Sequence, residues 1–151
     1  MARFTLGRDI KFFESIAREL VDVVVETSVV LYKLIIEDSK TNLYGESLNK
    51  TYYQGVECTA MIERESSTSD YEGFGSDKNQ LVEFRFNRFT LEDKGFYPEV
   101  GDIIFHNNGY FEIDNVREDQ MVGGQVDNKW SIICSTFMTR RSTIQTEMRI
   151  V

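Results

Sequence analysis

The sequence predicts a mainly β fold, a small antiparallel β-barrel or sandwich preceded by one N-terminal amphipathic helix. Near the N-terminus, apolar residues recur every three or four positions, as on one face of a helix. From about residue 29 they alternate with polar residues, as in half-buried strands. The 151 residues are 41% hydrophobic and include one proline, a composition typical of a globular protein. We expect one domain over 1–151, with a barrel at about 29–139 and a tail at 140–151.

The helix is expected over about residues 8–26. It should end near Val25 to Ser28, because the composition turns β-branched there and "SVVLYKLIIE" suits a strand better. Charged residues fill the positions between the apolar ones, so the helix is amphipathic. Its apolar positions are Ile10, Phe13, Ala17, Leu20, Val21 and Val24.

Three later segments alternate as strands do: "GVECTAMIER", "LVEFRFNRF" and "KWSIICSTFMT". They follow a predicted loop, "EDSKTNLYGES", whose turn-forming residues are Asn42 and Gly45. Residues 65–80, rich in Ser, Asp and Gly, are typical of a long loop that is either functional or disordered. We expect this loop to become ordered on assembly, the alternative being a loop that is mobile in every state.

A hairpin is predicted in "PEVGDIIFHNNGYFEIDNV". A two-residue Asn-Gly turn would leave two apolar residues of the first strand on the wrong face. A three-residue loop, 107–109, with Gly109 in the left-handed conformation, instead pairs Ile103 with Ile113 and places them on one apolar face. In this register His106 lies opposite Tyr110, away from that face.

The residues that carry chemistry are too few to specify an active site. His106 is the only histidine, and no second histidine or cysteine pair could complete a metal site with it. Cys58 and Cys134 are expected to be buried, reduced cysteines. The segment "GFGSDK" lacks the lysine-serine ending of a phosphate-binding loop. We therefore expect no enzymatic activity, no metal and no cofactor.

The charge balance argues against binding to polyanions. The chain has 17 Lys and Arg against 25 Asp and Glu, a net charge of −8, whereas proteins that neutralise phosphates are basic. The longest apolar run is too short for a bilayer and contains Lys33. The N-terminus has no apolar core typical of a secretory signal, so we expect synthesis in a reducing cytoplasm.

The order of several motifs resembles neck proteins of contractile-tailed bacteriophages, the head-completion or head-closure group. These motifs are "TNLYGES", "VECTAMIERE", "FGSDKNQ", "VEFRF", "VGDIIFHNNGYFEIDNVREDQMVGG" and "SIICSTFMTR". The similarity covers about Thr41 to Arg141, with a weaker match in the helix. It is sharpest from Val100 to Gly123.

The resemblance implies a non-enzymatic virion protein assembled in the host cytoplasm. It would form a ring, expected to be hexameric, that closes the DNA-filled head. Its partners would be copies of itself, portal or adaptor proteins on the head side, and a tail terminator or other tail proteins. Packaged DNA would pass through the lumen without specific binding, and no membrane is involved.

In a heterologous ring, apolar residues outside the barrel core are candidates for the subunit interface. The C-terminal "TRRSTIQTEMRIV" forms a basic patch that we expect to dock on a neighbouring subunit. Two other functions remain open on the residues alone, a small β-barrel module that binds another protein and, less favoured, a metal-dependent hydrolase using acidic loops. The expected interface residues are Tyr71, Phe74, Tyr97, His106, Tyr110, Arg140 and Arg141.

Overall fold

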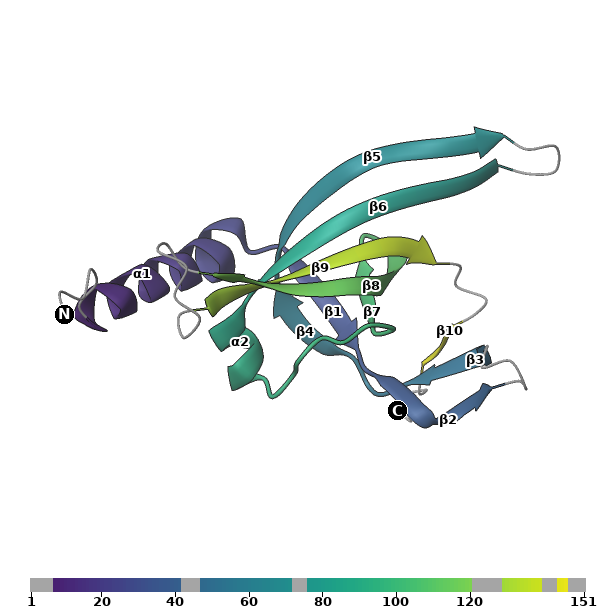
Figure 1. Ribbon diagram of the computed structural model, residues 1–151, viewed down its shortest axis with the longest axis horizontal. Coiled ribbons are helices and arrows are strands. Elements are labelled where there is room, and N and C mark those ends of the chain that lie inside the picture. The colour runs from purple at the N-terminus through teal and green to yellow at the C-terminus, as the bar shows by residue number, and fades with distance from the viewer. Residues whose placement is uncertain (1–6, 42–46, 72–75, 121–128, 140–143, 147–151) are drawn as a thin grey trace.

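A computed structural model of the protein describes residues 7–41, 47–71, 76–120, 129–139 and 144–146. Seven antiparallel strands form one curled sheet in the order β4-β1-β7-β8-β9-β6-β5, and a smaller sheet has the order β10-β3-β2 (Figure 1). The elements are α1 (Gly7–Glu19), the π-helix η1 (Leu20–Val25), β1 (Ser28–Tyr32), β2 (Leu34–Thr41), β3 (Ser47–Tyr52), β4 (Val56–Thr59), β5 (Met61–Tyr71), β6 (Ser76–Asn87), α2 (Arg88–Asp93), β7 (Ile103–His106), β8 (Gly109–Gln120), β9 (Lys129–Thr139) and β10 (Ile144–Thr146).

The large sheet is a nearly closed barrel, which confirms the predicted fold class. Its two edge strands, β4 and β5, are consecutive in the chain and are separated only by Ala60. The Ala60 amide donates a hydrogen bond to the Thr27 carbonyl, 3.0 Å away. The predicted strand at 55–64 is therefore two strands, each pairing with a different neighbour, and this sharp corner brings the two edges of the sheet together.

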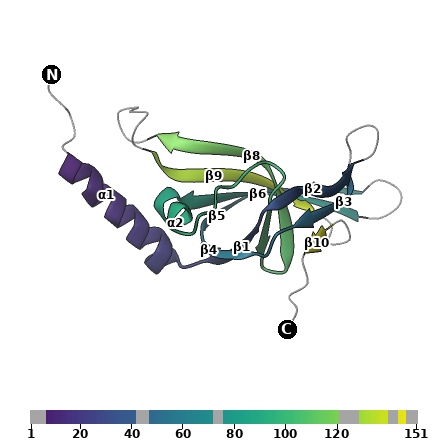
Figure 2. The same cartoon turned by 90° about the horizontal axis from the view of Figure 1, so that it is seen from below.

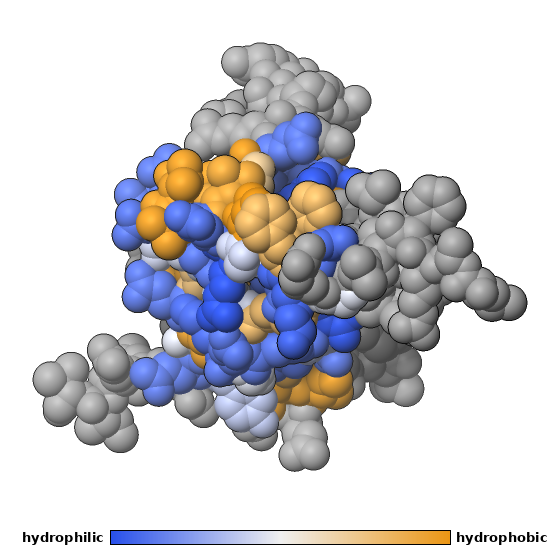
Figure 3. Space-filling model, turned by 90° about the vertical axis from the view of Figure 1, so that its left-hand side faces the viewer, coloured by the Kyte–Doolittle hydropathy of each residue, from blue (hydrophilic) through white to orange (hydrophobic). Residues whose placement is uncertain are grey.

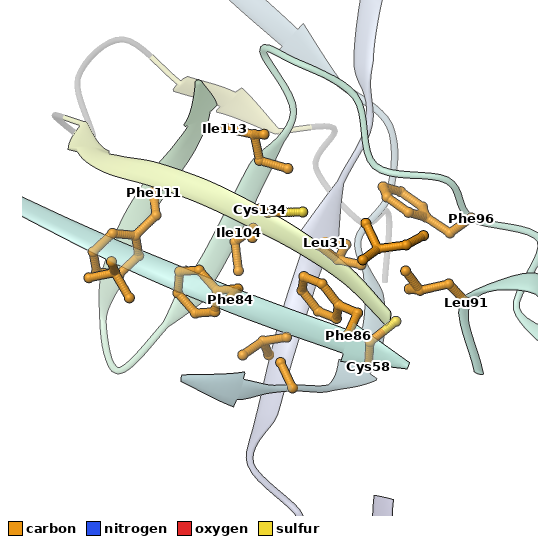
Figure 4. Close-up of a cluster of buried hydrophobic side chains, with 14 residues drawn as sticks. Leu31, Cys58, Phe84, Phe86, Leu91, Phe96, Ile104, Phe111, Ile113 and Cys134 are labelled. Carbon is orange, nitrogen blue, oxygen red and sulfur yellow. The ribbon is translucent and has the colours of Figure 1, made fainter. Parts of the chain in front are cut away.

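The barrel interior is filled by apolar side chains from seven elements (Figure 4). Cys58 and Cys134 belong to this core and are both free thiols, as expected. Burial raises the pKa of Cys134 to about 12. The core comprises Val29, Leu31, Cys58, Ala60, Val82, Phe84, Phe86, Leu91, Phe96, Ile104, Phe111, Ile113, Ile132 and Cys134.

The segment predicted as one strand, "SVVLYKLIIE", divides at Lys33. The part before it, β1, lies in the barrel, and the part after it, β2, begins the smaller sheet. The buried Asp102 carboxylate accepts hydrogen bonds from the Lys33 ammonium at 3.0 Å and from the Leu34 amide at 2.9 Å. A side chain distant in sequence therefore fixes the break.

The prediction of a loop at 65–80 is wrong. The described residues on both sides of 72–75 form a long hairpin in which Thr68 pairs with Asn79 and Tyr71 with Ser76. Serine and aspartate favour turns, but the hydrogen-bonded pairing of the two strands holds them extended here. The strand predicted at 81–89 ends at Asn87, whose side chain accepts a hydrogen bond from the Phe89 amide and caps α2.

The predicted register of the β7–β8 hairpin is also wrong. Its turn contains only Asn107 and Asn108, both with positive φ, at 47° and 62°, as in a type I′ turn. His106 pairs with Gly109, and Ile103 pairs with Glu112. Asparagine tolerates the left-handed region, so the glycine is not the bending residue. Gly109 is instead a buried strand residue.

The C-terminal region contributes β10, which pairs in parallel with β3 of the same chain. This differs from the expectation that the whole tail docks on a neighbour. Arg140 and Arg141 lie outside the described residues. None of the described helices is long and apolar enough to cross a membrane.

Candidate interaction surfaces

The N-terminal helix extends from one end of the barrel and exposes most of its large apolar residues (Figures 1 and 2). Phe12, Val23 and Val24 are 61%, 65% and 69% exposed. Hydrophobic side chains form a patch on the side of the molecule from which α1 projects (Figure 3). We call the following residues the apolar stripe: Phe12, Phe13, Ile16, Leu20, Val23, Val24 and Val25.

The helix contacts the barrel through polar groups. The Arg18 guanidinium lies 2.6 Å from the Asp93 carboxylate. The Asp22 carboxylate accepts hydrogen bonds from the hydroxyls of Thr59 and Thr90, the latter at 2.7 Å. Of the apolar residues in α1 and η1, only Val21 is buried. The helix therefore attaches by its polar face and leaves the apolar stripe in solvent.

This arrangement confirms the predicted helix but not the simplest expectation for its apolar face. An amphipathic helix on a globular domain normally buries its apolar side against the core. Here Phe13, Leu20 and Val24 are exposed. The helix widens to a π-helix at its end, a feature common at functional sites, and Glu26 closes it in the left-handed conformation, with φ of 45°.

Three further exposed apolar residues, Ile36, Tyr53 and Val100, lie in segments near the junction of β1 and β2. Ile36 is 77% exposed and follows Leu34 on the same face of β2. Val100 adjoins Gly101, where an added side chain would meet the Leu34 methyl group at 3.3 Å. The Tyr53 amide donates to the Lys33 carbonyl at 2.9 Å. Tyr53 therefore lies opposite Lys33, on the other face of this sheet from Ile36.

A partly buried ion pair, Lys33 with Asp102, lies at the junction of β1 and β2. The Asp102 side chain is 1% exposed, and one of its oxygens lies 3.0 Å from the Lys33 ammonium. The same carboxylate accepts hydrogen bonds from the Leu34 and Glu99 amides, at 2.9 and 2.8 Å. Lys33 also lies 2.9 Å from the Glu99 carboxylate. Both charges are satisfied, which a buried ion requires.

Tyr97 is the clearest surface residue among those predicted for the interface. It is 49% exposed, and its hydroxyl donates a hydrogen bond to the Glu118 carboxylate at 2.8 Å. That hydrogen bond raises the pKa of Tyr97. Hydrogen bonds from Lys129 and Tyr97 lower the pKa of Glu118. Tyr97 is therefore held in place by a charged network.

The other predicted residues are less exposed or lie outside the description. The His106 ring makes an edge contact with the core residue Phe84, with ring centroids 6.3 Å apart, so the expectation that it lies off the apolar face is wrong. Tyr110 is half-buried against Phe105. Tyr71 ends β5, and its side chain is outside the description, as are Phe74, Arg140 and Arg141.

The described residues contain no group of three or more His, Cys, Asp or Glu side chains placed to hold a metal ion. The buried carboxylate in this part of the chain, Asp102, is occupied by Lys33 and two backbone amides. Burial raises the pKa of Cys58, so its thiol is a poor nucleophile. These groups act in packing and in hydrogen bonding.

No family model matches the sequence, and no curated protein matches it significantly. Among solved structures, the chain is similar to a chain from the "Virion of native gene transfer agent (GTA) particle". The two share 13% sequence identity with a TM-score of 0.47, over 74% of this chain and 93% of that one.

Proposed function

We propose that this protein is a structural virion protein of the neck of a contractile-tailed phage. It would form a ring, expected to be hexameric, between portal or adaptor proteins and the tail, closing the DNA-filled head and providing the surface on which the tail docks. The observation that carries the proposal is the apolar stripe on a helix whose polar face is already bound to its own barrel. Such a surface suits a subunit that completes its packing on another protein.

The sequence resemblance supplies the phage context. Its sharpest part begins at Val100 and runs through the loop before β7 and the β7–β8 hairpin. Gly101 has φ of 94°, a conformation that other residues rarely adopt, and its amide donates to the Ile113 carbonyl at 2.9 Å. Asp102 anchors the break between β1 and β2. The most recognisable residues thus have architectural roles, which agrees with a structural protein.

The charge of the chain agrees with a channel through which DNA passes. A net charge of −8 disfavours nonspecific attraction to phosphates. DNA could then move through the ring without being retained by its wall.

The proposal is tested by removing the protein from phage production and by locating it in the particle. We expect particles that lack it to be tailless heads that do not retain their DNA, together with free tails. Adding the purified chain to such extracts should restore joined particles. A gold-labelled antibody should mark the neck. Normal particles without the protein, or label confined to the tail tip, would contradict the proposal.

A protein-binding module outside the virion is the second candidate, since the apolar stripe also suits a partner of that kind. The same experiment separates the two. A binding module would be absent from purified particles, whereas a neck protein copurifies with them in several copies for each portal.

A further inference from the structure

We propose that the apolar stripe docks in an apolar groove of a different protein, which places a basic side chain against Glu19. This inference deepens the proposed neck function, on which it rests, by naming the chemistry of the partner that this face of the helix recognises. In the assembled neck the partner would be a head or tail protein that adjoins the ring.

The first argument is the size of the uncovered surface. With about 150–200 Å² for a whole large apolar side chain, the exposed fractions correspond to on the order of 600 Å² for the apolar stripe. Monomers rarely expose a contiguous apolar patch above a few hundred Å², and each partner of a specific interface buries roughly 800 Å². The stripe and its polar margin therefore have the size of one side of a protein–protein contact.

The second argument is the shape of the stripe. Phe12, Ile16 and Leu20 follow one another at four-residue steps, and Phe13 and Val24 broaden the line on one side. The helix projects from one end of the barrel, so its outer face is open to a partner (Figures 1 and 2). An amphipathic helix with anchors at this spacing is typically bound in an apolar groove.

The third argument is a charge inside the stripe. Glu19 follows Ile16 by three positions and precedes Val23 by four, so it lies among these apolar residues on the outer face of the helix. Its exposed carboxylate makes no hydrogen bond or ion pair with another described residue. A surface that covers the stripe also covers this carboxylate, and a buried carboxylate without a partner is costly. The covering protein must therefore supply a cation.

The fourth argument decides between a second copy and another protein as the source of that cation. Most basic side chains whose surroundings the structure describes already pair with a carboxylate of their own chain. They are Arg18, Lys33, Lys50, Arg88, Arg117 and Lys129. Lys94 donates to the Glu57 carbonyl. A second copy that used one of these groups would lose an existing interaction, whereas a basic groove on another protein would not.

The helix itself does not supply the missing cation in a favourable place. Lys11 is exposed, but it lies eight positions before Glu19 and is turned from it by about 80° around the helix axis. Residues 7–26 contain three basic and five acidic residues, and the whole chain has a net charge of −8. Opposite potentials favour association and like potentials oppose it. The charge of the chain therefore favours a basic partner over a second copy.

The test measures binding of the fluorescently labelled full chain to the tailless heads and to the free tails that form without this protein. Glu19→Ala removes the charge, Glu19→Lys reverses it, and Val23→Glu places a second charge in the stripe. The matched control is Asp114→Lys, at an exposed residue of β8, which changes the net charge as much as Glu19→Lys does. Circular dichroism checks that each variant folds.

We expect the unmodified chain to bind saturably to one of the two particles. Glu19→Ala should weaken binding on the order of 10-fold, because an interfacial charge pair is lost, and Glu19→Lys on the order of 100-fold, because two like charges then meet. Val23→Glu should weaken binding at least as much as Glu19→Lys. Asp114→Lys should change the affinity by no more than about threefold, through long-range charge alone.

Four results would overturn the inference. Tighter binding of the Glu19→Ala chain would show that the covering surface holds no cation there, because removing an unpaired buried charge is favourable. Oligomers of the unmodified chain that Val23→Glu abolishes, measured by sedimentation velocity, would assign the stripe to a second copy. Binding to phosphatidylcholine vesicles that Val23→Glu abolishes would assign it to a lipid surface. The fourth result is an unmodified chain that binds neither heads nor tails.

Failure of this inference is distinguishable from failure of the proposed function. Equal binding of the unmodified and Val23→Glu chains to heads or tails would remove the stripe from the contact and leave the neck function intact. Normal particles formed without the protein would contradict the neck function itself, before any binding is measured, and the partner inferred here would fall with it.

Discussion

The barrel core and the apolar stripe have similar compositions and opposite environments. Both are rich in phenylalanine and branched aliphatic residues, yet Phe84 is 0% exposed and Phe12 is 61% exposed. The core strands pack against one another, whereas the helix is attached by Arg18 and Asp22. An apolar pattern thus identifies which side of an element avoids water, but the polar contacts decide whether that side meets the protein's own core or a partner.

The largest difference should appear on truncating equivalent residues in the two regions. Phe84→Ala empties part of the core and should lower the free energy of unfolding by about 3–5 kcal/mol. Phe12→Ala makes the same chemical change on the apolar stripe and should alter it by no more than about 0.5 kcal/mol in the monomer. Urea unfolding of both variants measures the two changes in the free energy of unfolding. Similar losses would mean that the stripe is covered within the chain.

Asp102 tests the ion pair at the break between β1 and β2. Asp102→Ala removes the partner of Lys33 and the acceptor for two backbone amides. Breaking a buried ion pair in this way should cost about 3 kcal/mol. Glu99→Ala, at an exposed residue that also pairs with Lys33, is the control and should cost about 0.5 kcal/mol. Equal losses of unfolding free energy in the two variants, measured by urea unfolding, would show that Asp102 stabilises the fold no more than Glu99 does.

Asp22 tests the attachment of the helix. Asp22→Ala leaves the Thr59 and Thr90 hydroxyls without their acceptor and should cost about 1–2 kcal/mol. Amide exchange should become faster in α1 and η1 while the barrel strands keep their protection, because the helix is a separate unit of local stability. The control Glu19→Ala, at an exposed position of the helix, should change neither the free energy of unfolding nor the rate of amide exchange. Faster exchange in the barrel strands as well would show that the helix supports the core.

The smallest effect concerns Glu118, whose lowered pKa arises from hydrogen bonds donated by Lys129 and Tyr97. A carboxyl with a lowered pKa in the folded state adds stability above its ordinary pKa and loses that contribution as the pH falls through the folded value. Glu118→Gln should therefore cost about 0.5 kcal/mol at neutral pH, and the difference from the unmodified chain should vanish in acid. A difference independent of pH would show that the charge is not responsible.

The fold class could be predicted because it depends on periodicity, which the sequence contains directly. The helix at its predicted place and the alternating strands around Phe84 and Cys134 are examples. The break at Lys33 could not be predicted, because it depends on Asp102, distant in sequence. The long β5–β6 hairpin was missed because its residues resemble those of a loop and are extended through pairing.

The register of the β7–β8 hairpin was also predicted wrongly. Counting apolar faces favoured a loop that ends at Gly109, but Asn107 and Asn108 both adopt the left-handed conformation and form the turn by themselves. Ile103 is buried although it lies on the opposite side of β7 from the core residue Ile104. Because both faces of β7 are covered at this point, counting apolar faces cannot distinguish the two possible hairpin registers. The predicted apolar face of the helix shares only Phe13, Leu20 and Val24 with the apolar stripe. The exposure of the stripe depends on Asp22 and Arg18 meeting partners in the barrel.

The most direct test of the central claim measures the exposure of the stripe before and after assembly. In a Val23→Cys chain the new thiol should react rapidly with a maleimide, while Cys58 and Cys134 are buried and should react slowly. We predict that the new thiol is protected in assembled particles, whereas the thiol of a Ser15→Cys control stays reactive. Equal reactivity of the Val23→Cys thiol in the free chain and in particles would contradict the claim that the apolar stripe is an assembly surface.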